Sequence, residues 1–251
     1  MSKVILHELE APEKQYVITG AIYSIVCFFS LPFVFALFSG GLYGNMKALS
    51  WFEIVFHGVN FIVVVSLFRE YLSDGMLNLQ LNIKQVIPTA AIAAGLIFVV
   101  GFYWHYLYLF KGRTLLEPIA FGTIPLSEMD ILTLSGNVVY GAPVFGTLCM
   151  VLVVPVVTSC LYYAIGFAPF YNIRPWLGYL VVCFAVLFPR LCNIFSGWDT
   201  DTELMLYVAQ LPAHLISCWA FRRTNTIWTP IIAHMIVNLL TCLLLIMFYI
   251  I

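Results

Sequence analysis

Apolar residues fall into long runs along this chain, and short polar stretches separate the runs. A helix that crosses the hydrocarbon layer of a bilayer needs about 20 predominantly apolar residues. The pattern therefore predicts an all-α polytopic membrane protein with about seven transmembrane helices, or eight if a polar segment re-enters the membrane. The predicted spans are 16–39, 50–68, 85–110, 139–166, 175–195, 203–221 and 227–250.

Two of the polar connections are long enough to have structure of their own. Segment 69–84 is amphipathic, and its Asp74-Gly75 pair predicts a turn. Segment 111–136 is the longest polar stretch, and we expect it to cover a helix end or to re-enter the membrane. We expect residues 1–140 to supply the N-terminal helices and this polar loop. Residues 141–251 would form the helical core of the same integrated membrane domain.

Composition supports the membrane assignment. The chain is 63% hydrophobic and 9% charged, with a mean hydropathy of +1.00, whereas a soluble domain has about 25% charged residues. The net charge of −1 leaves no basic patch for nucleic acid. The seven cysteines lack paired spacing, so we expect reduced thiols and neither a metal site nor a cofactor. The first fifteen residues are polar and acidic, which is untypical of a cleavable signal peptide.

The distribution of lysine and arginine predicts the orientation of the helices, because positive charge is enriched on the cytoplasmic side. A cytoplasmic N-terminus would place seven of these residues inside, namely Lys3, Lys14, Arg69, Lys84, Arg174, Arg222 and Arg223. The four outside would be Lys47, Lys111, Arg113 and Arg190. The excess favours a cytoplasmic N-terminus and an external C-terminus.

The last apolar run contains a polar pair, His234 and Asn238, four residues apart. Four residues make about one helical turn, so both side chains share one face of the helix. Unsatisfied polar groups in lipid cost several kcal/mol or so. The pair therefore faces protein, water or a ligand, either as a hydrogen bond between helices or as part of a functional site.

The stretch from Phe221 to Asn238 resembles the C-terminal signature of the CPBP family, the CAAX-protease and bacteriocin-processing membrane proteins, also called Abi. That signature is a His-x-x-x-Asn motif after an Arg-x-Thr-like turn and a Trp-x-Pro helix start, and His234 and Asn238 fill it here. Residues 154–157 (Val-Pro-Val-Val) are similar to the lead-in to the family's first motif, and 175–188 to its middle helix. The resemblance covers roughly residues 150–245 and implies a CPBP-like helical core in the C-terminal half.

Two of the family's three motifs are missing from this chain. Active members carry Glu-Glu-x-x-x-Arg, where this chain has Thr158, Ser159 and Tyr163. They also carry Phe-x-x-x-His, where this chain has Phe188 and Cys192. In the family, the first glutamate activates water, while the histidines and the asparagine position it and stabilise the oxyanion. The aligned hydroxyls lack a neighbouring base, so these residues are vestigial-site candidates in a degenerate member.

Other residues offer alternative chemistry. Thr158 and Ser159 are small residues whose hydroxyls we expect to bond back to helix carbonyls. Cys192 would be a buried small side chain, or a nucleophile with His234 as its base. His214 follows Pro212 in mid-span, as a structural histidine or a replacement for the lost one.

Further binding candidates lie outside the motifs. Glu53 and His57 form an acid–histidine pair one helical turn apart. Two histidines and a carboxylate would suit zinc, but no local ligand spacing supports a metal. In the short loop between the fifth and sixth predicted spans, Trp198 and Asp199 are the residues that we expect to contact a partner.

Three functional hypotheses follow. The leading one is a catalytically degenerate scaffold or regulator that binds, stabilises or positions another membrane protein or a membrane-anchored enzyme. The family resemblance implies a bacterial plasma membrane and links to bacteriocin immunity. The first alternative is an intramembrane peptidase with a rearranged site, using Glu53 or an acid of segment 111–136 beside His234. The second is a transporter or lipid-binding subunit with a cavity lined by His214, His234 and Asn238.

Overall fold

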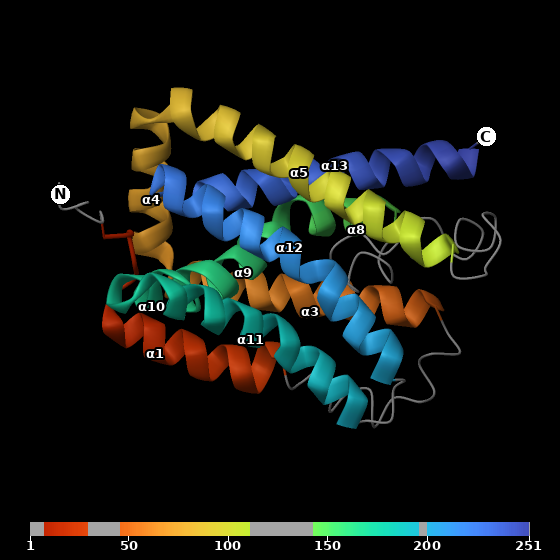
Figure 1. Cartoon of the computed structure of the whole chain (residues 1–251), viewed down its shortest axis with the longest axis horizontal. Coiled ribbons are helices and arrows are strands. Elements are labelled where there is room, and N and C mark those ends of the chain that lie inside the picture. Colours follow the sequence, from red (N-terminus) through yellow and green to blue (C-terminus); the bar gives the residue numbers. More distant parts are fainter. Residues whose placement is uncertain (1–7, 30–45, 111–142, 196–199, 251) are drawn as a thin grey trace.

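The computed structural model describes residues 8–29, 46–110, 143–195 and 200–250. Within these ranges every regular element is helical and no strand occurs, as the all-α prediction required. The helices are α1 (Lys14–Tyr23), η1 (Ser24–Phe29), α3 (Met46–Leu67), α4 (Arg69–Leu81), α5 (Ile83–Phe110), α8 (Pro143–Leu148), η2 (Cys149–Val153), α9 (Val154–Ser159), η3 (Cys160–Ile165), α10 (Ala168–Ile173), α11 (Pro175–Phe195), α12 (Thr200–Thr224) and α13 (Trp228–Ile250). The long helices run roughly along one direction (Figure 1).

Among the described residues, three helical stretches are long and apolar enough to cross a membrane: Ile83–Gly101, Phe145–Ile173 and Pro175–Phe195. A fourth is counted if Ile54–Leu67 and Arg69–Leu81, which meet at 80°, form one broken span. These helices fit a membrane protein. The seven or eight spans stay a prediction, and part of the first predicted span, 30–39, lies outside the described residues.

Helix α4 lies across one end of the bundle, where it connects α3 to α5 (Figure 1). The expected turn at Asp74-Gly75 is wrong, because α4 runs unbroken through both residues. Gly75 instead allows a close approach of the chain before α13. A Cβ there would lie 3.2 Å from Trp228 Cδ1, and Thr226 Oγ1 donates to the Gly75 carbonyl at 3.1 Å.

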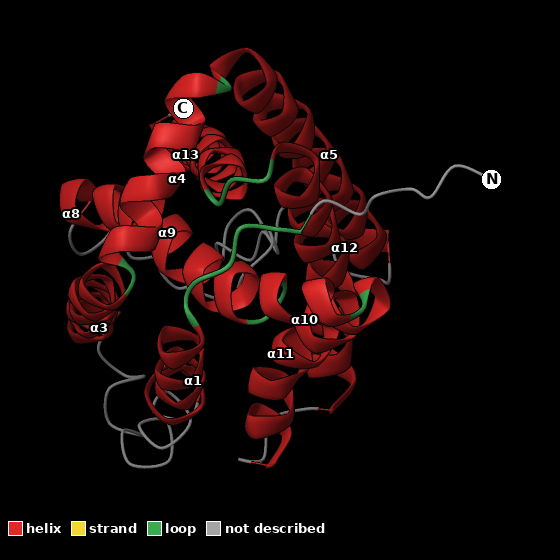
Figure 2. Cartoon of the chain, turned by 90° about the vertical axis from the view of Figure 1, so that its left-hand side faces the viewer, coloured by secondary structure: helices red, strands yellow, loops and turns green. Residues whose placement is uncertain are grey.

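The stretch from α9 to η3 is buried within the bundle, whereas α8 lies at its edge (Figure 2). An apolar 18-residue window within Phe145–Ile173 is 78% buried, against 22% for the corresponding window of Pro175–Phe195. Two π-helical turns, η2 and η3, interrupt the α-helical geometry of Phe145–Ile173. Short π-helical insertions rotate the side chains that follow them and occur often at functional sites.

Small side chains bring the two halves of the chain together. Helix α5 packs against α12 and α13 through alanines on all three helices: Ala90, Ala93, Ala94, Ala213, Ala220 and Ala233. Small residues allow helix backbones to approach closely in membrane proteins. A larger cluster joins α3, α4 and η3 to α11 and α12, so the described helices share one packed interior.

Hydrogen bonds connect segments that are far apart in sequence at one end of the bundle. Leu9 pairs with Asn172, near the end of α10, through its backbone N–H and carbonyl, both at 2.8 Å. The Glu10 N–H donates to Asn225 Oδ1 in the α12–α13 turn at 2.7 Å. Gln85 Nε2, at the start of α5, donates to the Arg223 carbonyl at 3.0 Å. The N-terminal segment and three helix connections thus meet at the same end.

Candidate functional site

His234 and Asn238 lie on the inner face of α13, one turn apart, as their spacing predicted. Their side chains are 4% and 3% exposed, so neither faces lipid or bulk water. Each has partners from other parts of the bundle, and the two sets of partners differ.

Tyr163 connects His234 to a second histidine. Its hydroxyl lies 3.1 Å from His234 Nε2 and 2.9 Å from His214 Nδ1. Ser217 Oγ lies 3.0 Å from the same His234 nitrogen. These side chains come from η3, α12 and α13 and are all buried. Tyr163 is therefore the centre of a buried chain of hydrogen bonds.

The number of protons on the hydroxyls and imidazoles determines which atom donates in each of these bonds. Ser217 Oγ donates its single proton to the Ala213 carbonyl at 2.9 Å, so it accepts a proton from His234. His234 therefore carries a proton on Nε2, which it shares between the hydroxyl oxygens of Ser217 and Tyr163. The Tyr163 hydroxyl then donates to His214 Nδ1. With this assignment the protons of Ser217, Tyr163 and His234 Nε2 each have an acceptor.

Asn238 satisfies a backbone carbonyl that the central helix leaves unpaired. Its Nδ2 donates to the Met150 carbonyl at 2.8 Å. In an α-helix that carbonyl would accept from Val154, but the Val154 N–H bonds to Cys149 instead, in the π-helical turn η2. The next residue, Pro155, has no N–H to offer. The Pro-containing lead-in and the Asn of the last motif are thus two parts of one helix–helix contact.

The hydroxyls of Thr158 and Ser159, two residues of the candidate site, differ in their contacts. Thr158 Oγ1 donates to the Val154 carbonyl at 2.8 Å, the local back-bond that we expected. Ser159 is fully buried, and its hydroxyl has no hydrogen-bond partner within the described part of the chain. Ser159 lies one turn before Tyr163 on the central helix.

The remaining candidates come from other elements or lie outside the described residues. Cys192 is half-buried on α11, a helix that contributes no side chain to it. His57 is buried on α3, against the ring of Phe56. Glu53 lies on the same helix, with its side chain outside the described part of the structure. Trp198, Asp199 and segment 111–136 also lie outside the described residues.

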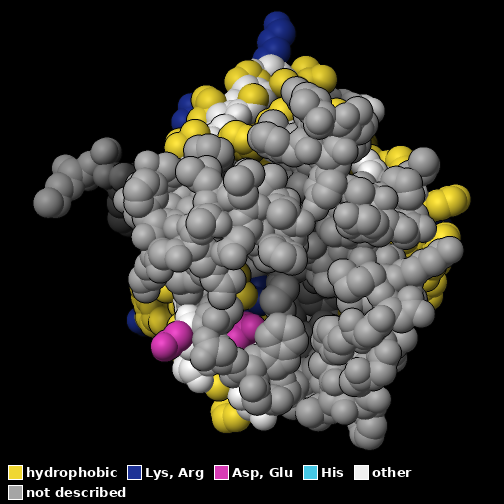
Figure 3. Space-filling model, turned by 90° about the vertical axis from the view of Figure 1, so that its right-hand side faces the viewer, with side chains coloured by type: hydrophobic (Ala, Val, Ile, Leu, Met, Phe, Trp, Pro, Cys, Tyr) yellow, Lys and Arg dark blue, Asp and Glu magenta, His cyan; other side chains and the backbone are white. Residues whose placement is uncertain are grey.

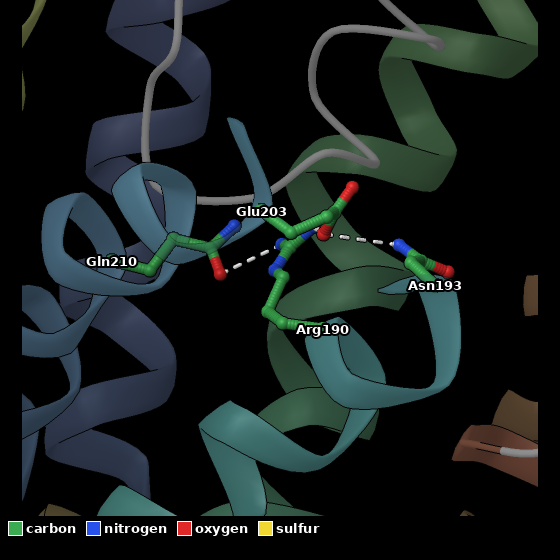
Figure 4. A network of polar contacts seen from close by, with 4 residues as sticks. All are labelled: Arg190, Asn193, Glu203 and Gln210. Carbon is green, nitrogen blue, oxygen red and sulfur yellow. Dashed lines mark hydrogen bonds and ion pairs between the residues drawn. The ribbon is translucent and has the colours of Figure 1, made fainter. Parts of the chain in front are cut away.

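A second buried polar network, which the sequence did not predict, joins α11 and α12 (Figure 4). Arg190 Nη2 donates to Gln210 Oε1 at 2.7 Å, and Arg190 Nη1 lies 3.5 Å from Glu203 Oε2. Asn193 Nδ2 donates to the same Glu203 oxygen at 3.2 Å. Arg190 and Glu203 are 6% and 0% exposed.

Arg190 is therefore an internal residue and does not belong to the external charges counted from the sequence. A charged residue inside an apolar run was the available signal, because such residues are rare in membranes and have partners. The end of the molecule where α12 begins shows basic and acidic side chains close together in a hollow (Figure 3).

The hydrogen-bonded ring nitrogens of the central cluster are engaged by hydroxyl groups. Within the described residues, the hydrogen-bond partners of His214 and His234 are hydroxyl groups, and no carboxylate bonds to either ring. No group of three His, Cys, Asp or Glu side chains in the same part of the chain could hold a metal ion. Hydrogen bonds of this kind between side chains of different helices stabilise helix contacts.

Comparison of the chain with protein-family models found no match, and comparisons with curated proteins and with solved structures found none either. The resemblance to the CPBP family thus depends on the motif residues themselves, and the geometry above shows what those residues contact.

Proposed function

We propose that this chain is a catalytically degenerate CPBP-like membrane protein that acts as a scaffold or regulator. It would bind another membrane protein or a membrane-anchored enzyme and stabilise or position it in a bacterial plasma membrane. One observation carries this proposal. The Tyr163 hydroxyl lies between His214 and His234, and all three side chains are buried.

This arrangement leaves the residues of the last motif without a free catalytic group. Peptide hydrolysis needs a base and hydrogen-bond donors directed at the developing oxyanion. His234 Nε2 is engaged by two hydroxyls, and the Asn238 amide donates to a backbone carbonyl. The motif residues thereby support the scaffold by holding η3, α12 and α13 together.

The outer surface suits membrane partners. Large apolar side chains are exposed along the outer faces of the long helices, among them Val59 and Ile62 of α3, Val99 of α5, and Leu180 and Phe184 of α11. Exposed apolar surface of this kind needs lipid or another membrane protein to cover it.

We also propose the seven-span arrangement with a cytoplasmic N-terminus. Alternating spans would place the N-terminal segment and the connections 69–84, 168–174 and 222–227 on one side of the membrane. The hydrogen bonds of Leu9, Glu10 and Gln85 join these same segments at one end of the bundle, which supports the alternation. If the buried Arg190 is left out of the count, seven basic residues lie on the proposed cytoplasmic side and three lie on the opposite side.

Affinity purification of the tagged protein from its native membrane in mild detergent tests the scaffold proposal, with a peptidase assay on the same sample. We expect a stoichiometric membrane-protein companion whose abundance falls when this chain is deleted. The substitution His234→Ala should lower stability or companion binding without removing any peptide cleavage. Abolished cleavage of a defined peptide by a still-folded His234→Ala protein would favour the peptidase alternative and defeat the scaffold proposal.

A further inference from the structure

A cavity of about 310 Å³ lies at the end of the bundle where α3 meets α4. One wall is the N-terminal segment from Glu10 to Glu13, and the other is formed by the end of α3 and the start of α4. None of its lining residues belongs to the histidine–tyrosine chain of hydrogen bonds. Volumes of this order hold small ligands.

The walls of this cavity are fixed in place by hydrogen bonds. Leu9 is paired with Asn172 through both of its backbone groups. The Tyr71 hydroxyl of α4 donates to the Glu10 carbonyl at 3.2 Å, and Asn78 Nδ2 donates to Glu10 Oε2 at 3.0 Å. The N-terminal segment is thus attached to α4 on one side and to α10 on the other, so the cavity is formed before any ligand binds.

The charge around the cavity is unbalanced. Four carboxylates line it (Glu10, Glu13, Glu70 and Asp74) with one guanidinium, Arg69, which gives a formal charge of −3. Among the described residues, the ion pair lies elsewhere, between Arg190 and Glu203. None of these five groups therefore has an oppositely charged described residue at ion-pair distance. Burial raises the pKa of the Glu10 carboxyl, the bond from Asn78 lowers it, and the nearby charge of Asp74 raises it further.

The lining favours an organic cation over a metal ion. No three acidic, His or Cys side chains of the described chain converge as metal ligands would. The aromatic residues Tyr16 and Tyr71 also line the cavity, and aromatic rings accept an aliphatic stem or a cation over their faces.

We propose that this cavity binds an alkylammonium group, a primary amine carried on an aliphatic stem. The carboxylates of Glu10 and Asp74 would receive the ammonium group, and the tyrosines would contact the stem. The amine comes from a free polyamine or from a lysine side chain of a partner polypeptide. The proposal concerns a different part of the molecule from the scaffold function and does not depend on it.

Calorimetry on the full chain in lipid nanodiscs tests the proposal, at constant ionic strength, with spermidine and with the capped tripeptide Ac-Ala-Lys-Ala-NH2. We expect saturable binding of at least one probe. Affinity should fall at least about tenfold, or about 1.4 kcal/mol, in the Glu10→Gln/Asp74→Asn variant. The amide that replaces the Glu10 carboxylate keeps an oxygen for the Asn78 donor, so the fold is retained.

Two controls make the result specific. Glu8→Gln removes one charge from the exposed N-terminal segment outside the cavity lining and should leave affinity within about twofold, well under 1.4 kcal/mol. Arg69→Gln removes the one positive charge of the lining and should tighten binding. The unmodified protein should bind one probe more tightly than the other. A preference for spermidine would assign the amine to a free polyamine, and a preference for the tripeptide would assign it to a polypeptide. Absence of saturable binding to both probes, or equal weakening by Glu8→Gln, would overturn the proposal.

Discussion

The amide of Asn238 donates to the carbonyl of Met150, which lies 88 residues earlier in the chain. That carbonyl lacks a helical donor because Val154 bonds to Cys149 and Pro155 has no N–H. The contact explains why a proline in the central helix and an asparagine in the last helix occur together. It also assigns Asn238 a structural role that needs no substrate.

Asn238→Leu should destabilise the protein by about 1–3 kcal/mol, because it leaves the buried Met150 carbonyl without a donor. Thermal unfolding in detergent measures the effect. Thr241→Val is the matched control on the same helix, since Thr241 Oγ1 bonds only back to Val237 and should cost little. Equal losses for the two variants would contradict the role assigned to Asn238.

Tyr163→Phe should destabilise by a similar amount, about 1–3 kcal/mol, because both histidines lose their bond to the buried hydroxyl. The melting temperature of the purified protein checks this. Tyr207→Phe, on a partly buried tyrosine of α12, serves as the control and should melt close to the unmodified protein. A Tyr163→Phe protein of unchanged stability would show that the hydroxyl contributes nothing to packing.

Arg190→Met should cost about 3–5 kcal/mol, because it leaves the fully buried Glu203 carboxylate without its cation. The double variant Arg190→Met/Glu203→Met should recover much of that loss, since it removes both buried charges at once. A double-mutant cycle of unfolding free energies measures the coupling. Strictly additive effects would mean that the two charges do not interact.

Gly178→Ala and Gly95→Ala should change stability in opposite directions. A Cβ at Gly178 would lie 2.9 Å from the backbone oxygen of Phe167, which cannot move aside easily. A Cβ at Gly95 would meet no described atom within 4 Å. Alanine favours a helix over glycine by about 0.5–1 kcal/mol, so Gly95→Ala should stabilise the protein while Gly178→Ala lowers its melting temperature. Matching shifts in one direction would be inconsistent with this packing.

Glu10→Gln should stabilise the protein at neutral pH but not in acid. The folded state raises the pKa of Glu10, so it binds the proton more tightly than the unfolded chain does. Stability contributed by this group is therefore fully present below the ordinary pKa of 4.5 and is lost as pH rises through the raised value. Melting temperatures of Glu10→Gln and of the unmodified protein, measured across this window, should diverge as pH rises.

The positions of the helices could be predicted from the sequence because they depend on local hydrophobicity. The predicted span 175–195 coincides with α11, and 227–250 with α13 to within one residue. The shared face of His234 and Asn238 also followed from spacing alone, since helical periodicity determines it. The turn predicted at Asp74-Gly75 was wrong, because glycine occurs where helices pack closely as well as in turns.

The partners of the polar residues could not be predicted, because they come from distant parts of the chain. Nothing near Tyr163 in sequence indicates that its hydroxyl lies between two histidines 51 and 71 residues away. Arg190 interrupts an apolar run, which indicates a buried charge with a partner, but only packing against α12 identifies Glu203 as that partner. Hydrophobic periodicity thus determined the helices and their inner faces, and the tertiary contacts between helices decided which polar groups are paired.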